Sequence, residues 1–154
     1  MPVIQHTDFI TPEECAGWRV DYDMRAPASP HRGYSGEPYV YLPRNRIWGL
    51  TDRIADLSEE GVKFESAVLA CLLPNGWHPP HIDNGRPNIA HRVFSAIVYL
   101  SSDFRGGKLR FSNENLEITP HEGLMVAFPA SLEHEVRQVT AGRRYSIAMW
   151  FRKR

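Results

Sequence analysis

From Val62 to the end of the chain, short apolar runs alternate with turn residues, and this pattern constrains the fold more than any other feature. Breaks such as Pro74-Asn75-Gly76 and Asn84-Gly85 separate the runs and are typical of turns. Strands are therefore predicted at residues 62–73, 91–101, 107–111, 115–119, 123–128, 133–139 and 143–152. Many short strands at this spacing indicate a β-sandwich or barrel.

A helix is predicted near the start of the chain. Thr11 can cap it, Pro12 suits its first position, and Glu14 stands where a capping box requires a glutamate. We expect this helix to end at about Tyr22.

A second helix is predicted from Arg46 to Glu60, with Gly61 as its C-terminal stop. Apolar residues recur within it at helical spacing, at Ile47, Leu50, Ile54 and Leu57. This stripe should lie against a sheet. The fold class is therefore mostly β, a double-stranded β-helix (jelly roll) with N-terminal helices packed on one sheet. One domain over residues 1–154 is expected, with a helical and loop layer at 1–61 and a jelly-roll core at 62–154.

Residues 26–44 are rich in proline, glycine and tyrosine, and two interpretations of this segment stay open. It can be a plain connecting loop. It can also be a lid or a substrate-gripping finger, because long ordered loops in small domains are often functional.

Composition excludes several classes of partner. The chain carries 18 basic and 18 acidic residues, so its zero net charge gives no general attraction to nucleic acid or anionic membrane. No apolar run reaches the length of a membrane span, and the first residues lack a secretory signal. Cys15 and Cys71 are expected to be reduced, buried thiols. A soluble, cytoplasmic protein is the expectation.

His81 and Asp83 form the motif to which a chemical function can be attached. Residues i and i+2 of an extended segment point to the same face, so an imidazole and a carboxylate should lie side by side. His134, at the start of a later strand, can supply a second imidazole. Two histidines and one carboxylate form the facial triad of non-haem Fe(II) oxygenases.

Arg144 begins a run of alternating apolar residues, Tyr145 to Phe151. An arginine there either reaches solvent or has an anionic partner inside, because an unpaired buried charge is costly. A guanidinium grips a carboxylate through two parallel hydrogen bonds. Together with a metal triad it would hold a small dicarboxylate.

Residues 74–152 resemble the catalytic core of the Fe(II)/2-oxoglutarate dioxygenases, specifically the prolyl 4-hydroxylase-like branch. The stretches that carry the resemblance are His81–Asp83, Arg92–Leu100, Phe104–Phe111, Pro120–Gly123, Phe128–Pro129, His134–Val136, Gly142–Ser146 and Trp150–Phe151. They occur in family order and cover about half of the chain.

The resemblance implies that His81, Asp83 and His134 bind Fe(II). It implies that Arg144 pairs with the distal carboxylate of 2-oxoglutarate and that Tyr99 lends its hydroxyl to the same cosubstrate. A core tyrosine bonded to a backbone carbonyl is the alternative for Tyr99. O2 is the second cosubstrate, and ascorbate is a further candidate cofactor.

On the substrate side, Arg92 follows the loop after Asp83 and can meet a substrate backbone. The resemblance places Trp150 beside the iron, and Tyr39 of the 26–44 segment is a third candidate contact. It also implies a tight turn at Gly106-Gly107.

Other polar residues have simpler interpretations. His78 is expected to line the mouth of the site, although it can compete with Asp83 as a ligand. His121 is expected in a turn, His91 on a surface strand, and Arg143 in solvent.

Three functions remain open. The first is hydroxylation of a protein or peptide residue, most of all proline, which the Tyr-rich segment favours. The second is hydroxylation of a free amino acid or other small metabolite. The third is a non-catalytic metal-binding barrel. A nucleic-acid demethylase of the same superfamily would carry a second arginine at position 150, where this chain has tryptophan.

Overall fold

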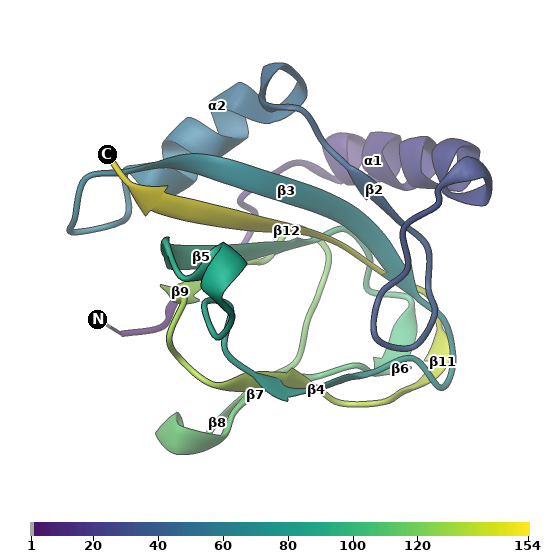
Figure 1. Cartoon of the computed structure of the whole chain (residues 1–154). Helices are drawn as coiled ribbons and strands as arrows, with labels where there is room; N and C mark the ends of the chain where they lie inside the picture. The colour runs from purple at the N-terminus through teal and green to yellow at the C-terminus, as the bar shows by residue number, and fades with distance from the viewer. Residues whose placement is uncertain (1) are drawn as a thin grey trace.

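Two antiparallel β-sheets lie one above the other, and both helices cover the outer side of the larger sheet (Figure 1). The computed structural model describes residues 2–154. The major sheet has six strands in the order β1-β9-β5-β12-β3-β2, the minor sheet has four in the order β4-β10-β7-β8, and β11 pairs with β6. This is the predicted double-stranded β-helix. The strand bounds are β1 Ile4–His6, β2 Tyr39–Tyr41, β3 Val62–Leu72, β4 His78–His81, β5 Arg92–Tyr99, β6 Phe104–Gly106, β7 Leu109–Phe111, β8 Leu116–Ile118, β9 Met125–Pro129, β10 His134–Val136, β11 Val139–Gly142 and β12 Arg144–Lys153.

Helix α1 (Pro12–Arg25) begins with the predicted capping box. The Glu14 amide donates to the Thr11 hydroxyl over 3.1 Å, and the Thr11 amide donates to the Glu14 carboxylate over 3.2 Å. The helix continues one turn past the predicted end and buries Cys15 and Tyr22 against the major sheet.

Helix α2 (Arg44–Ala55) starts earlier and ends earlier than predicted. Its buried residues, Ile47, Thr51 and Ile54, confirm the apolar stripe. The prediction that Gly61 ends the helix is wrong. The last helical residue is Ala55, and the Leu57 and Ser58 amides donate to the carbonyls three residues before them, in tight turns rather than in a continued α-helix.

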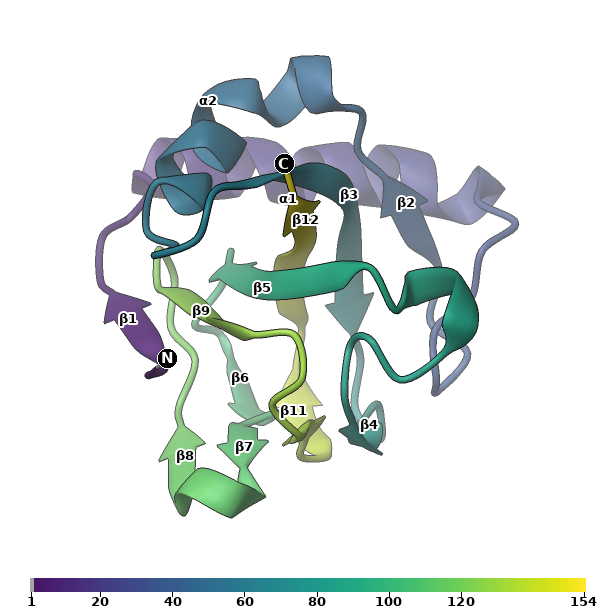
Figure 2. The ribbon, with the colours of Figure 1, turned by 60° about the vertical axis from the view of Figure 1, so that its left-hand side comes forward.

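The two faces of the major sheet have different roles. Alternate residues of β5, Phe94, Ala96 and Val98, belong to the core beneath the helices. Residues on the opposite face of β5, among them Tyr99, face the minor sheet, and Tyr99 packs in a second core with Leu109. Figure 2 shows the same two layers from another side, with α1 and α2 beyond the major sheet. Side chains on the inner face therefore contact the minor sheet, and the major sheet separates them from the helices.

The seven predicted strands are present, with ends within three residues of those predicted. Five further strands were not predicted: β1, β2, β4, β6 and β11. The 26–44 segment is more regular than a loop, since it contains a short 3-10 helix (Ala26–Ala28), β2 and the first residue of α2. Each unpredicted strand has only three or four residues, a length at which an alternating pattern is hard to recognise, although β7, β8 and β10 are equally short and were predicted.

No helix within residues 2–154 is long and apolar enough to cross a membrane. Cys15 and Cys71 are buried free thiols, as predicted. A cytoplasmic location and the absence of a nucleic-acid partner stay predictions.

Candidate metal centre and anion site

His81, Asp83 and His134 come together between the two sheets. His81 ends β4, His134 begins β10, and these two residues pair directly across the minor sheet. Asp83 lies in the turn after β4 rather than in an extended segment as predicted, and its amide donates to the Ala130 carbonyl over 2.8 Å. Asp83 Oδ1 is 3.3 Å from His81 Nε2 and 3.4 Å from His134 Nε2. One ligand atom from each residue lies within 4.8 Å of the others, close enough for the three residues to hold one metal ion.

Backbone carbonyls fix the orientation of both imidazoles. His81 Nδ1 lies 2.7 Å from the Pro79 carbonyl, and His134 Nδ1 lies 2.9 Å from the Leu132 carbonyl. Each Nδ1 therefore carries the proton, which leaves the Nε2 lone pair for a metal. No sequence pattern could have indicated these carbonyls, because any residue type supplies one.

Asp83 is held as a carboxylate although it is buried. Burial alone would raise its pKa, but contacts from His134 and His81 and a hydrogen bond from Ser95 bring the pKa well below its usual range. The Ser95 hydroxyl donates to Asp83 Oδ2 over 2.7 Å, so Oδ1 remains for a ligand bond. Two imidazoles and one carboxylate brought together between the two sheets fit Fe(II) with positions left open.

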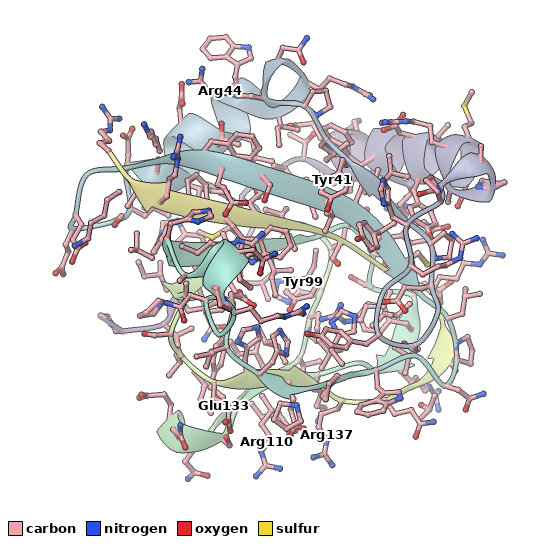
Figure 3. All side chains as sticks on the ribbon, viewed as in Figure 1. Tyr41, Arg44, Tyr99, Arg110, Glu133 and Arg137 are labelled. Carbon is pink, nitrogen blue, oxygen red and sulfur yellow. The ribbon has the colours of Figure 1, made fainter. Side chains whose placement is uncertain are left out.

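Arg144 and Tyr99 form a second polar group between the sheets. Arg144 is 3% exposed, which excludes the solvent-reaching alternative. Its Nε donates to the Gly107 carbonyl over 2.9 Å, and its Nη2 is 3.4 Å from the Tyr99 hydroxyl. Within residues 2–154 no carboxylate forms an ion pair with it, and burial lowers its pKa. Figure 3 shows Tyr99 between the sheets, whereas Arg110 and Arg137 project from the minor sheet away from them.

The predicted turn at Gly106-Gly107 is confirmed, and it serves this group. Both glycines have positive φ, +73° and +65°. A Cβ on Gly107 would lie 2.8 Å from Arg144 Cδ, so only glycine allows the arginine to pack here.

Of the three predicted substrate contacts, Arg92 and Trp150 lie together beside the triad, and Tyr39 lies elsewhere. Arg92 stacks 4.3 Å above the Trp150 ring and forms an ion pair of 2.6 Å with Glu65. Its Nη1 lies 3.5 Å from the Asp83 carbonyl, so the pair borders the triad. Tyr39 instead stacks on His31 at the edge of the major sheet, at 5.4 Å between ring centroids.

The remaining histidines stay outside the triad. His78 Nε2 lies 3.0 Å from the Glu37 carboxylate. His91 lies in the turn before β5, not on a strand as predicted, and contacts Glu65 at 3.2 Å. His121 is exposed beside a turn, as predicted. Arg143 is exposed to solvent, also as predicted.

Sequence reasoning missed two residues of the site. Ser95 shares the inner face of β5 with Tyr99, four residues on, so the alternation of that strand could have identified it. Glu37, the partner of His78, lies forty-one residues away from it, and no sequence pattern joins the two.

Comparisons with known proteins agree with this geometry. The family model described as the 2OG-Fe(II) oxygenase superfamily matches residues 67–152. Prolyl 3-hydroxylase 3 of Homo sapiens is 33% identical over 114 residues, which cover 70% of this chain and 14% of that protein. The chain thus spans only a small part of the curated relatives that it matches.

Two solved structures share the fold. The viral collagen prolyl hydroxylase of Paramecium Bursaria Chlorella virus-1 matches with a TM-score of 0.78 and 16% identity, over 99% of this chain and 96% of that chain. A Pseudomonas putida prolyl-4-hydroxylase matches with a TM-score of 0.78 and 21% identity, over 99% and 92%. At these identities the likeness concerns the fold alone.

Proposed function

Because the chain belongs to the 2OG-Fe(II) oxygenase superfamily, we propose that it is an Fe(II)- and 2-oxoglutarate-dependent hydroxylase of a prolyl residue in a protein or peptide. The observation that carries this proposal is that a triad of metal-ligand type and a buried guanidinium with no ion-pair partner within residues 2–154 lie between the same two sheets. A dicarboxylate with a keto group at one end matches both.

His81, Asp83 and His134 are the proposed iron ligands, through Nε2, Oδ1 and Nε2. When bound, Fe(II) with 2-oxoglutarate and O2 supplies the chemistry that converts a C–H bond to C–OH while 2-oxoglutarate becomes succinate and CO2. The part of the chain is to keep the imidazoles in one tautomer and the carboxylate ionised. Ser95 and the Pro79 and Leu132 carbonyls do this.

Arg144 is the proposed partner of the distal carboxylate of 2-oxoglutarate, with Tyr99 beside it. The Tyr99 hydroxyl has Arg144 as its neighbour, and no hydrogen bond from it to a backbone carbonyl occurs within residues 2–154. This supports the cosubstrate role over that of a core tyrosine. Burial makes the charge pairing stronger than it would be in water.

Arg92, Trp150 and Tyr39 are the proposed substrate contacts. The prolyl substrate is supported by the names of the relatives and neighbours, which are prolyl hydroxylases. A free amino acid processed by the same chemistry is the second candidate, because Nη1 of Arg92 is not bonded to Glu65, lies near the triad and can donate to a free carboxylate.

The test is a product assay with the purified chain, Fe(II), 2-oxoglutarate and ascorbate. Proline-containing peptides and free amino acids are offered in separate reactions, and mass spectrometry detects the addition of one oxygen atom. We expect addition on peptidyl proline and an equal amount of succinate. His134→Ala should abolish both, whereas the matched control His121→Ala, at an exposed histidine, should keep them.

Oxygen addition only to free amino acids would replace the peptide substrate by the second candidate. A chain that binds 2-oxoglutarate with metal yet forms no succinate with any substrate would be a non-catalytic barrel. Activity of His134→Ala equal to that of the wild type would remove this residue from the triad.

A further inference from the structure

A segment from Ser29 to Pro38, here called the strap, leaves the end of α1, descends to the level of β4 and returns to β2 (Figure 1). Arg32 and Pro38 form an isolated antiparallel bridge, and the Gly33 amide donates to the Glu37 carbonyl over 2.8 Å. Gly36 has a φ of +83°, which closes the turn. The strap is therefore an ordered turn with its own backbone hydrogen bonds rather than an irregular loop.

Ser35 fastens the strap to the residue before β4. The Trp77 amide donates to the Ser35 hydroxyl over 3.0 Å. The Trp77 carbonyl and Glu37 Oε2 each lie 3.1 Å from that hydroxyl, and either can accept its proton. The Ser35 hydroxyl thus contacts both the backbone amide and the backbone carbonyl of Trp77, as a neighbouring strand would.

Glu37 and His78 make the second fastening, 3.0 Å from Oε1 to Nε2. Glu37 has a side-chain exposure of 8%. Burial would raise its pKa, but the His78 hydrogen bond lowers it, and burial lowers the pKa of His78. A neutral imidazole therefore donates to an ionised carboxylate. A Cβ on Gly33 would overlap this carboxylate, so the absence of a side chain at Gly33 makes room for the Glu37–His78 contact.

The two fastenings fix the Tyr34 ring against the site. Its centroid is 5.1 Å from that of His78 and 5.4 Å from that of His81, one of the proposed iron ligands. Tyr34 is nevertheless 52% exposed, and none of the hydrogen bonds within residues 2–154 involves its hydroxyl. A tyrosine that only filled the core would be buried with its hydroxyl bonded.

We propose that Tyr34 is a specificity-determining residue, whose ring forms the wall beside His81 against which a proline-containing peptide packs. This inference rests on the proposed function and names a residue that selects its substrate. Aromatic surfaces suit proline-rich segments, because the extended polyproline conformation is already formed and presents apolar rings. The strap holds the Tyr34 ring in place before the peptide arrives, which reduces the entropy lost on binding.

The first experiment measures binding without turnover. The full chain with Zn(II) and 2-oxoglutarate is titrated against a fluorescent peptide with proline at every second position, and anisotropy gives the Kd. Tyr34→Ala should raise the Kd about tenfold, and Tyr34→Phe should leave it within about twofold because the ring remains. The matched control is Trp48→Ala, which removes an exposed aromatic ring from α2 on the outer side.

The second experiment asks whether the strap acts through Tyr34. Glu37→Ala should raise the peptide Kd, while Glu37→Gln should restore it, because an amide oxygen still accepts from His78. The double variant Tyr34→Ala with Glu37→Ala should bind no more weakly than Tyr34→Ala alone. Additive effects would show that Glu37 does not act through the ring.

The outcomes separate this inference from the proposed function. Peptide binding that depends on Tyr34, with no oxygen added to any peptide, would overturn the function and leave Tyr34 as a peptide-binding residue. Peptide hydroxylation together with an unchanged Kd for Tyr34→Ala would do the reverse. The inference also fails if a peptide with alanine in place of proline binds equally well, or if Tyr34→Ala weakens 2-oxoglutarate binding as much as peptide binding.

Discussion

Arg144 is a positive charge kept inside the protein without a carboxylate from residues 2–154 beside it. Burying a charge costs several kcal/mol unless excellent pairing offsets it. The contacts present are the Gly107 carbonyl, the Tyr99 hydroxyl and the Tyr99 ring at 5.0 Å. They satisfy part of the guanidinium but do not neutralise it. The ligand-free protein is therefore destabilised at this residue in a way that an anionic ligand can reverse.

Replacing Arg144 should separate stability from function. Arg144→Met keeps much of the volume and removes the buried charge, so the thermal midpoint of the ligand-free chain should stay equal or rise. Affinity for 2-oxoglutarate should fall by about 2–4 kcal/mol, as expected when one partner of a desolvated pair is lost. Thermal melts with and without 2-oxoglutarate measure both effects. Arg143→Met, at the exposed neighbour, is the control, and an unchanged ligand response in Arg144→Met would assign Arg144 another role.

Among the elements, all of the long alternating strands could be predicted, whereas of the strands with three or four residues only β7, β8 and β10 could. β3, β5 and β12 have enough residues for the period of two to be visible, and β12 lies between the other two. β4 consists of His78-Pro79-Pro80-His81 and has no apolar residue in alternation. It is a strand because β10 pairs with it, and that contact joins residues more than fifty positions apart. Tertiary pairing thus decides what local pattern leaves open.

Two glycines should respond in opposite ways to the same substitution. Gly107→Ala forces a residue with a φ of +65° to carry a Cβ that meets Arg144, so unfolding free energy should fall by about 1–3 kcal/mol. Gly17→Ala places a Cβ in open space inside α1, so stability should rise by about 0.5–1 kcal/mol. Denaturant unfolding measures both. Equal destabilisation by the two would mean that backbone conformation is not what Gly107 supplies.

At the scale of the whole molecule, the sequence could name the residues with chemistry but not the contacts that orient them. His81, Asp83, His134 and Arg144 stand out because imidazoles, carboxylates and a guanidinium amid apolar runs are unusual. Glu37 and Tyr34 matter only through what they touch, and their partners lie on other elements. A glutamate or a tyrosine in a loop is ordinary in any sequence. The orientation of the site and its proposed substrate wall are therefore properties of the folded chain.

The two sheets each hold one part of the proposed cosubstrate site, and this predicts how ligands stabilise the chain. Arg144 lies on β12 of the major sheet, whereas His81 and His134 lie on β4 and β10 of the minor sheet. 2-Oxoglutarate bound to Arg144 and to a metal on the triad would tie the sheets together. At a concentration about 100 times its Kd, 2-oxoglutarate should raise the free energy of unfolding by about 2.7 kcal/mol. For a domain of this size that raises the thermal midpoint by roughly 5–10 °C.

Calorimetric melts under anaerobic conditions test this linkage with Fe(II), with EDTA, and with glutarate in place of 2-oxoglutarate. EDTA should remove most of the rise, because the keto acid then keeps only its Arg144 contact. Glutarate has both carboxylates but no keto group, so its smaller rise should be the same with and without metal. A full rise from 2-oxoglutarate in EDTA would show that the dicarboxylate binds without the triad, and the sheets would then not be joined through a metal.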